Sequence, residues 1–142
     1  MADAKLPQIL TLEIVTPEGL LLREQVDDVV VPGEEGYFGV RPGHTPLLAT
    51  MGAGVITYGR GGRRQQITCF WGFCEVLPDR VNVLAEVGER AEDIDVRRAE
   101  AAKDAAAARL KAVRDEAGYK EAHAAYVRAV TRLAVGRSQR GA

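Results

Sequence analysis

The sequence has no excess of charge of either sign and no long hydrophobic run. Its 142 residues include 19 lysines and arginines and 20 aspartates and glutamates, so the net charge is −1. A protein that binds nucleic acid through its phosphates needs a basic excess or stripe, so the balance argues against this class. The first ten residues lack the apolar core of a signal peptide, and no later run approaches the ~20 residues of a membrane span. We therefore expect a protein that stays out of oxidising compartments and does not insert into a membrane.

Cysteine and histidine are scarce. Cys69 and Cys74 are the only cysteines, and there are two histidines. The cysteine spacing matches no zinc pattern, and four such side chains are too few for a convincing structural metal site. We expect both cysteines to be small buried apolar side chains, with a metal site or a redox pair as the alternative.

Recognisable catalytic groups are missing as well. His44 lies in a loop rich in glycine and proline, and His123 lies on a polar helical segment; neither has a serine, cysteine or acidic partner nearby in the sequence. There is no P-loop, no HExxH pattern and no pair of metal-binding carboxylates. The sequence therefore predicts a non-catalytic protein.

The first two thirds of the chain have the pattern of short strands separated by turns. Leu10, Leu12 and Ile14 alternate with polar residues, which predicts a half-buried strand. The glycine cluster Gly59–Gly62 and the dipeptide Pro78-Asp79 are turn signals between β-rich runs and predict two hairpins. Frequent short strands with this much turn chemistry predict an antiparallel sandwich or barrel.

The rest of the chain has a helical pattern. Asp93 or Asp95 is placed to cap a first helix, which should run to about Glu116 with Gly118 as its stop. A second helix carries one apolar stripe, whose members are Tyr119, Ala122, Tyr126, Ala129 or Val130, and Leu133. Two helices joined by a tight turn should pack antiparallel, and their alanines allow the axes to come close.

We expect this hairpin to be weakly held. Large apolar residues are few on its first helix, so burial at ~25 cal/mol per Å² contributes little, while alanine keeps the helices formed. Two interpretations stay open at this point. The hairpin is either a mobile arm that acts as a conformational switch or a fixed arm that lengthens an oligomer interface.

The segment EEGYFGVRPGHTPLL, from Glu34 to Leu48, is the densest loop. Its glycines and prolines shape the backbone, and it displays Tyr37, Phe38 and Arg41, residue types that are enriched at protein interfaces. The alternative is a structural crossover whose aromatic side chains belong to the core. We interpret the glycines as serving the loop's shape and part of the loop as a docking edge.

Three stretches, in this order, resemble the epsilon subunit of bacterial F-type ATP synthases. They are GYFGVRPGHTPLL, GFCEVLPDRVNVLAE and ERAEDIDVRRAEAA, and the likeness extends from about residue 10 to residue 133. The resemblance implies an α+β protein. Residues 1–90 would form an antiparallel β-sandwich of two five-stranded sheets, and residues 91–142 would form an antiparallel two-helix hairpin.

The resemblance also implies a non-catalytic rotor subunit of a proton-translocating ATP synthase, peripheral on the cytoplasmic face of the bacterial membrane. The sandwich would dock on the gamma subunit and on the c-ring, with Tyr37, Phe38 and His44 facing the ring. Some relatives carry an acidic residue where this chain has Tyr37, so an aromatic contact would replace an ion pair. The hairpin would lie folded, or would extend into the catalytic alpha/beta hexamer and block ATP hydrolysis. The alternative is a free-standing sandwich module with a helical dimerisation arm.

Finally, the resemblance implies a regulatory ATP site between the two helices, with no cofactor required. Arg128 and Arg132 are four residues apart on one helix face, which an antiparallel hairpin brings toward Arg98 at the start of the other helix. The alternatives are that Asp95 is a plain helix cap and that the arginines pair with acidic segments of the catalytic subunits. The positions that match the family's nucleotide site are Glu89, Ile94, Asp95, Arg98, Ala99, Arg128 and Arg132.

Overall fold

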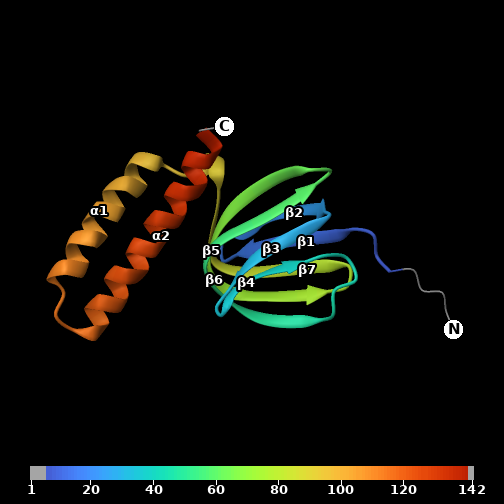
Figure 1. Cartoon of the computed structure of the whole chain (residues 1–142), viewed down its shortest axis with the longest axis horizontal. Coiled ribbons are helices and arrows are strands. Elements are labelled where there is room, and N and C mark those ends of the chain that lie inside the picture. The colour runs from blue at the N-terminus through green and yellow to red at the C-terminus, as the bar shows by residue number, and fades with distance from the viewer. Residues whose placement is uncertain (1–5, 141–142) are drawn as a thin grey trace. The chain divides into compact units, whose positions relative to one another are not determined.

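The computed structural model describes residues 6–140, and the chain divides into two compact units between Gly88 and Glu89 (Figure 1). The first unit is built on β-strands and the second on two helices, which confirms the predicted order of a β unit followed by a helical hairpin. The strands are β1 (Leu10–Thr16), β2 (Gly19–Val26), β3 (Asp28–Gly33), β4 (Gly36–Val40), β5 (Leu47–Arg60), β6 (Arg63–Leu77) and β7 (Arg80–Arg90).

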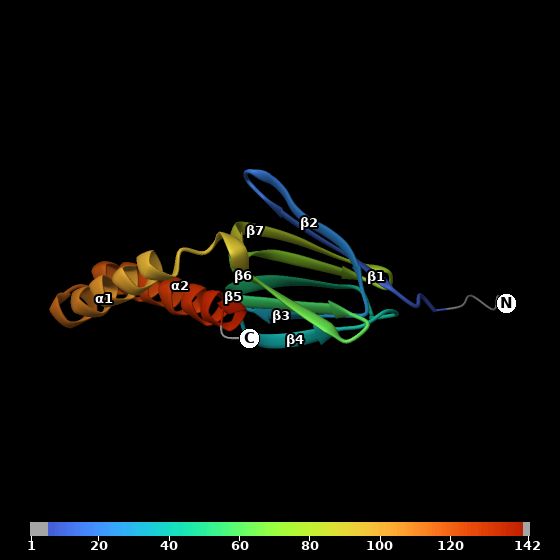
Figure 2. The same ribbon diagram turned by 90° about the horizontal axis from the view of Figure 1, so that it is seen from above.

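The prediction of two five-stranded antiparallel sheets is wrong. The seven strands form one continuous sheet in the order β2-β1-β7-β6-β5-β3-β4, and β1 runs parallel to β7. The sheet folds over so that β1, β2 and β7 lie above β3, β4 and β5 in Figure 2, which gives a sandwich-like shape. The strands β5 and β6 are 14 and 15 residues long. Because all seven strands are hydrogen-bonded in one continuous order, the two layers belong to one sheet and are not separate sheets.

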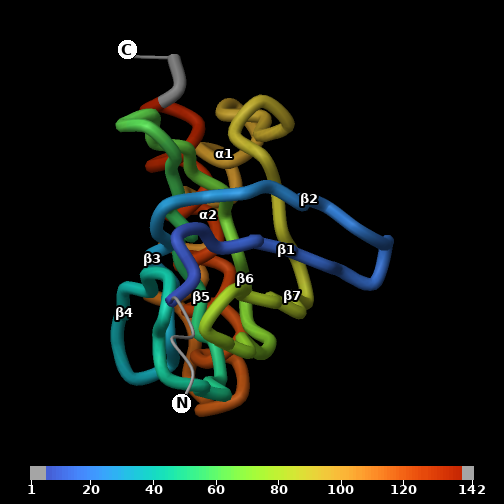
Figure 3. The backbone as a smooth tube through the Cα atoms, turned by 90° about the vertical axis from the view of Figure 1, so that its right-hand side faces the viewer, coloured from blue at the N-terminus to red at the C-terminus, as the bar shows by residue number. Residues whose placement is uncertain are grey.

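The predicted turns are found where the sequence placed them. Gly61 and Gly62 join β5 to β6, and Pro78 and Asp79 join β6 to β7. β1 and β2 form a hairpin that projects from the rest of the sheet (Figure 3). Within β6, Gly72 has a φ of 128°, and a Cβ atom there would lie 1.9 Å from the carbonyl oxygen of Leu84, so only glycine fits.

The core of the first unit lies between the folded-over layers. Leu10, Leu12 and Ile14 are fully buried, which confirms the strand predicted from their alternation. Cys69 and Cys74 are buried in the same cluster as unpaired thiols. Burial raises the pKa of each thiol to about 12, with smaller contributions from Cys74 on Cys69 and from the neighbouring carboxylate on Cys74. The interpretation of the cysteines as small buried side chains is confirmed.

The second unit contains the short 3-10 turn η1 (Ala91–Asp93) and the helices α1 (Val96–Ala112) and α2 (Glu116–Arg140). Asp95 caps α1, since its carboxylate accepts a hydrogen bond from the Arg98 N–H at 3.1 Å. Gly118 was expected to stop the first helix, and this is wrong. The helix ends at Ala112, and Gly118 lies in the first turn of α2, where its N–H donates to the Asp115 carboxylate at 3.2 Å.

The two helices pack against each other as an antiparallel pair (Figure 1). On α1 the buried side chains are Ala99 and Ala106, and on α2 Ala122, Ala129 and Leu133 of the predicted stripe are buried. Tyr119 and Val130 are 51% and 40% exposed, so the stripe is narrower than predicted and passes through Ala129. Small side chains dominate this packing, so each contact contributes little free energy.

Candidate functional site

A cavity of about 260 Å³ lies in the second unit, where α1 begins and α2 approaches its end. Its walls combine acidic, basic and small side chains. The lining residues are Glu89, Asp93, Asp95, Arg98, Ala99, Ala102 and Arg132. Ala99 and Ala102 are one turn apart on α1, and their short side chains leave the space that the cavity occupies.

The start of α1 forms one wall of this cavity. Asp95 is the cap residue, and the Ala99 N–H donates to the Asp95 carbonyl oxygen at 3.0 Å. The Asp95 carboxylate is engaged by the Arg98 N–H, so the proposed alternative role of Asp95 as a helix cap is present in the structure. The N-terminal end of a helix carries partial positive charge, which favours an anion at this wall.

The opposite wall carries an ion pair between Arg132 on α2 and Glu89, near the end of β7. The Arg132 Nε atom donates to the Glu89 Oε1 atom at 2.5 Å, and the two side chains are 28% and 27% exposed. A charge-assisted hydrogen bond in such a half-buried position is stronger than an exposed ion pair. The cavity walls carry three carboxylates against two guanidinium groups, which leaves a formal charge of −1.

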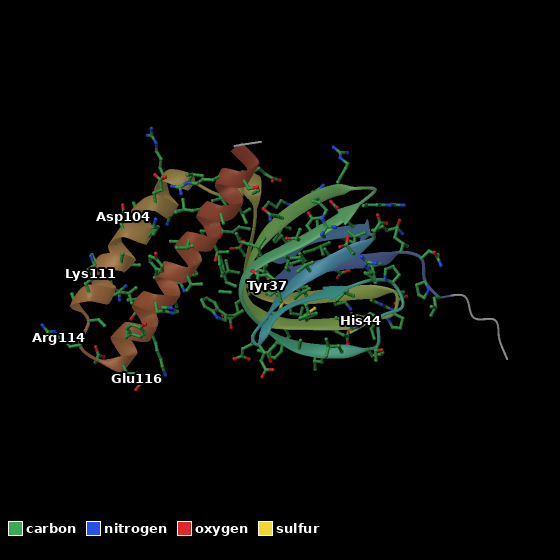
Figure 4. All side chains as sticks on the ribbon, in the orientation of Figure 1. Tyr37, His44, Asp104, Lys111, Arg114 and Glu116 are labelled. Atoms are coloured by element: carbon green, nitrogen blue, oxygen red, sulfur yellow. The ribbon has the colours of Figure 1, made fainter. Side chains whose placement is uncertain are left out.

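The turn end of the hairpin is charged and lies away from the cavity. Lys111, Arg114 and Glu116 lie at or beside this turn (Figure 4). Beyond the cavity, ion pairs among the described residues link the helices: Arg137 pairs with Glu100, and the Arg109 Nη2 atom lies 3.6 Å from the Glu121 Oε1 atom. All four of these side chains are about half exposed or more, so each pair contributes at most ~1 kcal/mol.

The segment predicted to be a loop that faces a partner lies in the first unit and is only partly a loop: Tyr37 and Phe38 lie on strand β4, and His44 lies in the connection from β4 to β5 (Figure 4). Tyr37 is 60% exposed, and its hydroxyl accepts a hydrogen bond from the Val55 N–H at 3.1 Å. Phe38 packs against the core cluster. The His44 Nδ1 atom donates to the Thr45 carbonyl oxygen at 2.6 Å, and His44 lines a cavity of about 500 Å³ beside this loop.

An apolar stripe, which the sequence analysis did not identify, crosses the outer face of the sheet over β2, β1, β7 and β6. Val15 is paired with Leu20 on β2 and with Leu84 on β7, so the three side chains point to one face. Phe73 follows on β6, the next strand. Leu20, Leu84 and Phe73 are 53%, 57% and 55% exposed. We call these four residues the apolar stripe; contiguous exposed apolar side chains of this kind mark interaction surfaces.

Comparison with known proteins decides the family. The family described as the beta-sandwich domain of the ATP synthase delta/epsilon chain matches residues 9–91, and the one described as its long alpha-helix domain matches residues 92–136. The chain belongs to the delta/epsilon chain family of ATP synthases. The resemblance noted in the sequence is thereby confirmed, and so is the prediction of a non-catalytic subunit.

Relatives in this family are similar over most of their length. The ATP synthase epsilon chain of Nitratidesulfovibrio vulgaris is 47% identical over 126 residues, which cover 89% of this chain and 94% of the relative. That of Solibacter usitatus is 55% identical over 97 residues, which cover 68% of this chain and 72% of the relative.

Among solved structures, a chain in the Euglena gracilis mitochondrial ATP synthase structure of OSCP, F1 and c-ring is similar with a TM-score of 0.82. The identity is 23%, and the match covers 94% of this chain and 85% of that one. A chain in the Tetrahymena thermophila mitochondrial ATP synthase central stalk and c-ring has a TM-score of 0.65 and 12% identity, covering 93% and 99%. At these identities the two likenesses show the fold alone.

The hairpin of this delta/epsilon chain brings together five of the seven residues that the sequence analysis assigned to a nucleotide. Glu89, Asp95, Arg98, Ala99 and Arg132 line the cavity. The other two do not. Ile94 is only 3% exposed, and Arg128 lies one helical turn before Arg132 and is half-buried outside the lining.

Two lining residues were missed by sequence reasoning. Asp93 is the last residue of η1, and Ala102 lies three residues after Ala99, on the same face of α1. The three-residue spacing was the available signal for Ala102. Within residues 6–140, no helix of this family member combines the length and the apolar character needed to cross a membrane.

Proposed function

We propose that this chain is a rotor subunit in the central stalk of a bacterial proton-translocating ATP synthase. In this proposal the β unit docks on the gamma subunit and the c-ring, and the hairpin restrains ATP hydrolysis and binds ATP. The complex would hold the chain on the cytoplasmic face of the membrane. Family membership supports the rotor role, as do the solved structures of similar fold, whose names include a c-ring and a central stalk.

The apolar stripe supports docking on the gamma subunit. Its exposed members Leu20, Leu84 and Phe73 face water in this chain. Burying one large apolar side chain stabilises a complex by ~1.5–3 kcal/mol, so a partner that covers the stripe gains several kcal/mol before the costs of association.

Contact with the c-ring is assigned to strand β4, which carries Tyr37 and Phe38, and to the loop after it, which carries His44. Tyr37 offers a largely exposed ring with its hydroxyl already bonded to Val55, so it presents an apolar body to a partner. Since no carboxylate stands at this position, the contact would rest on aromatic packing and on the His44 imidazole.

The cavity in the hairpin is the observation that carries the nucleotide role. Two guanidinium groups and the N-terminal end of the 17-residue helix α1 meet at its walls, and such groups bind phosphate. Its volume of about 260 Å³ lies just below the ~300–1,000 Å³ usual for ligand pockets. We therefore assign the phosphate chain to the cavity and the base and sugar to its mouth, with Arg128 one turn before Arg132 on α2.

Regulation follows from the weak packing of the hairpin. Its buried side chains are mostly alanines, and the exposed ion pairs between its helices add little. Ligand present at ten times its dissociation constant stabilises the bound form by ~1.4 kcal/mol, whereas driving an arm from one state fully to another needs ~10⁴-fold differential affinity. ATP would thus bias the folded hairpin against an extended form that blocks the alpha/beta hexamer.

A calorimetric titration of the protein with MgATP tests the nucleotide role. Arg98→Ala removes a guanidinium group from the cavity wall, and Arg97→Ala is the matched control, since Arg97 is an exposed neighbour outside the lining. We expect saturable binding that weakens at least tenfold in the first variant and changes less than threefold in the second. Equal weakening in both variants, or no binding to the folded wild type, would contradict the proposal.

A further inference from the structure

The side chain of Tyr37 reaches across a whole strand of the sheet. Tyr37 lies on β4, at one edge of the sheet, and its pair partner on β3 is Pro32. Its hydroxyl accepts a hydrogen bond at 3.1 Å from the Val55 N–H, and Val55 belongs to β5, on the other side of β3. One side chain of the edge strand is therefore bonded to the backbone of the next strand but one.

This hydrogen bond falls where the pairing of β3 with β5 is interrupted. The register shifts between Val30 and Gly33, where β3 advances three residues while β5 advances six. Pro32 lies in this part of β3 and has no N–H to donate to β5, which is why proline in a sheet is found at edges and irregularities. A strand N–H that leaves the ladder must find another acceptor, and the Val55 N–H finds the phenol oxygen.

Gly54 leaves the space that the Tyr37 ring needs. A Cβ atom at Gly54 would lie 2.7 Å from the Pro32 Cβ atom and 3.2 Å from the Tyr37 Cζ atom, where ordinary carbon contacts need ~3.5–4.0 Å. Gly54 has no positive φ, so its backbone conformation is open to other residues. The missing side chain is therefore what this position requires. Aromatic side chains placed over strand glycines are a known way to pin the register of a sheet.

We propose that the Tyr37 side chain is a clasp that ties the edge strand β4 to β5, and that Gly54 is the positioning residue that makes room for it. The clasp holds the ring in one orientation before any partner arrives. The second half of the inference rests on the proposed c-ring contact: the ring is a docking face that the sheet orients in advance. A partner that meets such a face does not bear the entropy cost of ordering the side chain.

Native-state amide hydrogen exchange on the full chain tests the clasp. Tyr37→Phe keeps the ring and removes the hydroxyl, and its matched control is Tyr119→Phe, at an exposed tyrosine on α2. Gly54→Ala places a methyl group in the space of the ring. Its matched control is Gly39→Ala on β4, because a Cβ atom at Gly39 would point into open space among the described residues.

We expect exchange of the Val55 amide to become about tenfold faster in Tyr37→Phe and in Gly54→Ala, because each change removes or displaces the acceptor. It should stay within twofold of wild type in both controls. Unchanged Val55 exchange in Tyr37→Phe would overturn the clasp, and this variant decides the matter even if Gly54→Ala does not fold. A Gly54→Ala variant that folds and behaves like Gly39→Ala would overturn the positioning role.

Binding of the full chain to a purified c-ring in the presence of gamma tests the docking half. We expect about fivefold weaker binding for Tyr37→Phe and Gly54→Ala and a larger loss for Tyr37→Ala, while the affinity for isolated gamma stays within twofold. A loss in Tyr37→Ala alone would leave the proposed c-ring contact standing and overturn the advance orientation of the ring. If Val55 exchange responds while all three variants bind the c-ring like wild type, the clasp is supported and the c-ring contact through Tyr37 fails.

Discussion

Gly136 sits inside α2 at a point where the helix packs closely on the start of α1. A Cβ atom added there would lie 2.9 Å from the Val96 Cγ2 atom and 3.2 Å from the Ile94 Cγ2 atom, where ordinary carbon contacts need ~3.5–4.0 Å. Overpacking of this kind costs ~1–3 kcal/mol, and alanine gains ~1 kcal/mol over glycine as a helix former. Gly136→Ala should therefore destabilise the folded hairpin by about 1 kcal/mol, against the direction of helix propensity.

Native-state amide hydrogen exchange measures this change in the helices themselves. We expect protection of the α1 and α2 amides to fall about fivefold in the Gly136→Ala variant. Ala134→Gly is the matched control, because Ala134 is exposed two residues earlier in α2 and its replacement costs propensity without altering this packing. The free energy lost in Ala134→Gly measures the helix propensity of alanine over glycine. Added to the free energy lost in Gly136→Ala, it gives the free-energy cost of overpacking at Gly136. Exchange that slows about fivefold in Gly136→Ala would refute the close approach.

Two further predictions concern the β unit. Replacing Phe73 or Leu84 with serine should weaken binding to the isolated gamma subunit by at least tenfold in surface plasmon resonance. The control Leu6→Ser changes an exposed apolar side chain outside the apolar stripe and should alter the affinity little. Equal weakening by all of these variants would contradict docking of gamma on the stripe. Because burial raises the pKa of the Cys69 and Cys74 thiols from 9.0 to about 12, the unfolded state ionises first as pH rises, so stability should be complete below pH 9 and fall above it. Chemical denaturation at pH 8 and pH 10.5 checks this, and an unchanged free energy of unfolding would contradict it.

The features predicted correctly from the sequence are those encoded by neighbouring residues. The alternation of Leu10, Leu12 and Ile14 predicts β1, and the turn residues Pro78 and Asp79 predict the β6–β7 hairpin, since each signal spans a few positions. The same kind of local signal made Asp95 one of the two predicted cap residues, with Asp93, and the structure shows Asp95 as the cap. The prediction for Gly118 is wrong because Asp115, three residues earlier, accepts a hydrogen bond from the Gly118 N–H. The second helix therefore begins before Gly118, and Gly118 lies inside it.

What the sequence did not reveal depends on pairing over long distances. The parallel pairing of β1 with β7 joins residues about 70 positions apart, and neither strand carries a signal of its partner. The apolar stripe follows from this register, because Val15 and Leu84 become neighbours only through it. Asp93 lines the cavity because the turn η1 positions it there. From the sequence alone, Gly136 would only be expected to weaken its helix, and the structure shows that Ile94 packs closely against it.

The rate of ATP hydrolysis tests the central proposal most directly, namely that the helical hairpin of this rotor subunit restrains the motor. A bacterial ATP synthase catalytic complex depleted of its own epsilon chain would be assembled with the whole chain or with a chain that ends at residue 91, the end of the matched β-domain. Co-purification with gamma would confirm that both forms are incorporated equally. We predict several-fold slower hydrolysis with the whole chain, and relief of that restraint when MgATP is raised. Equal rates with the two forms would contradict the proposal.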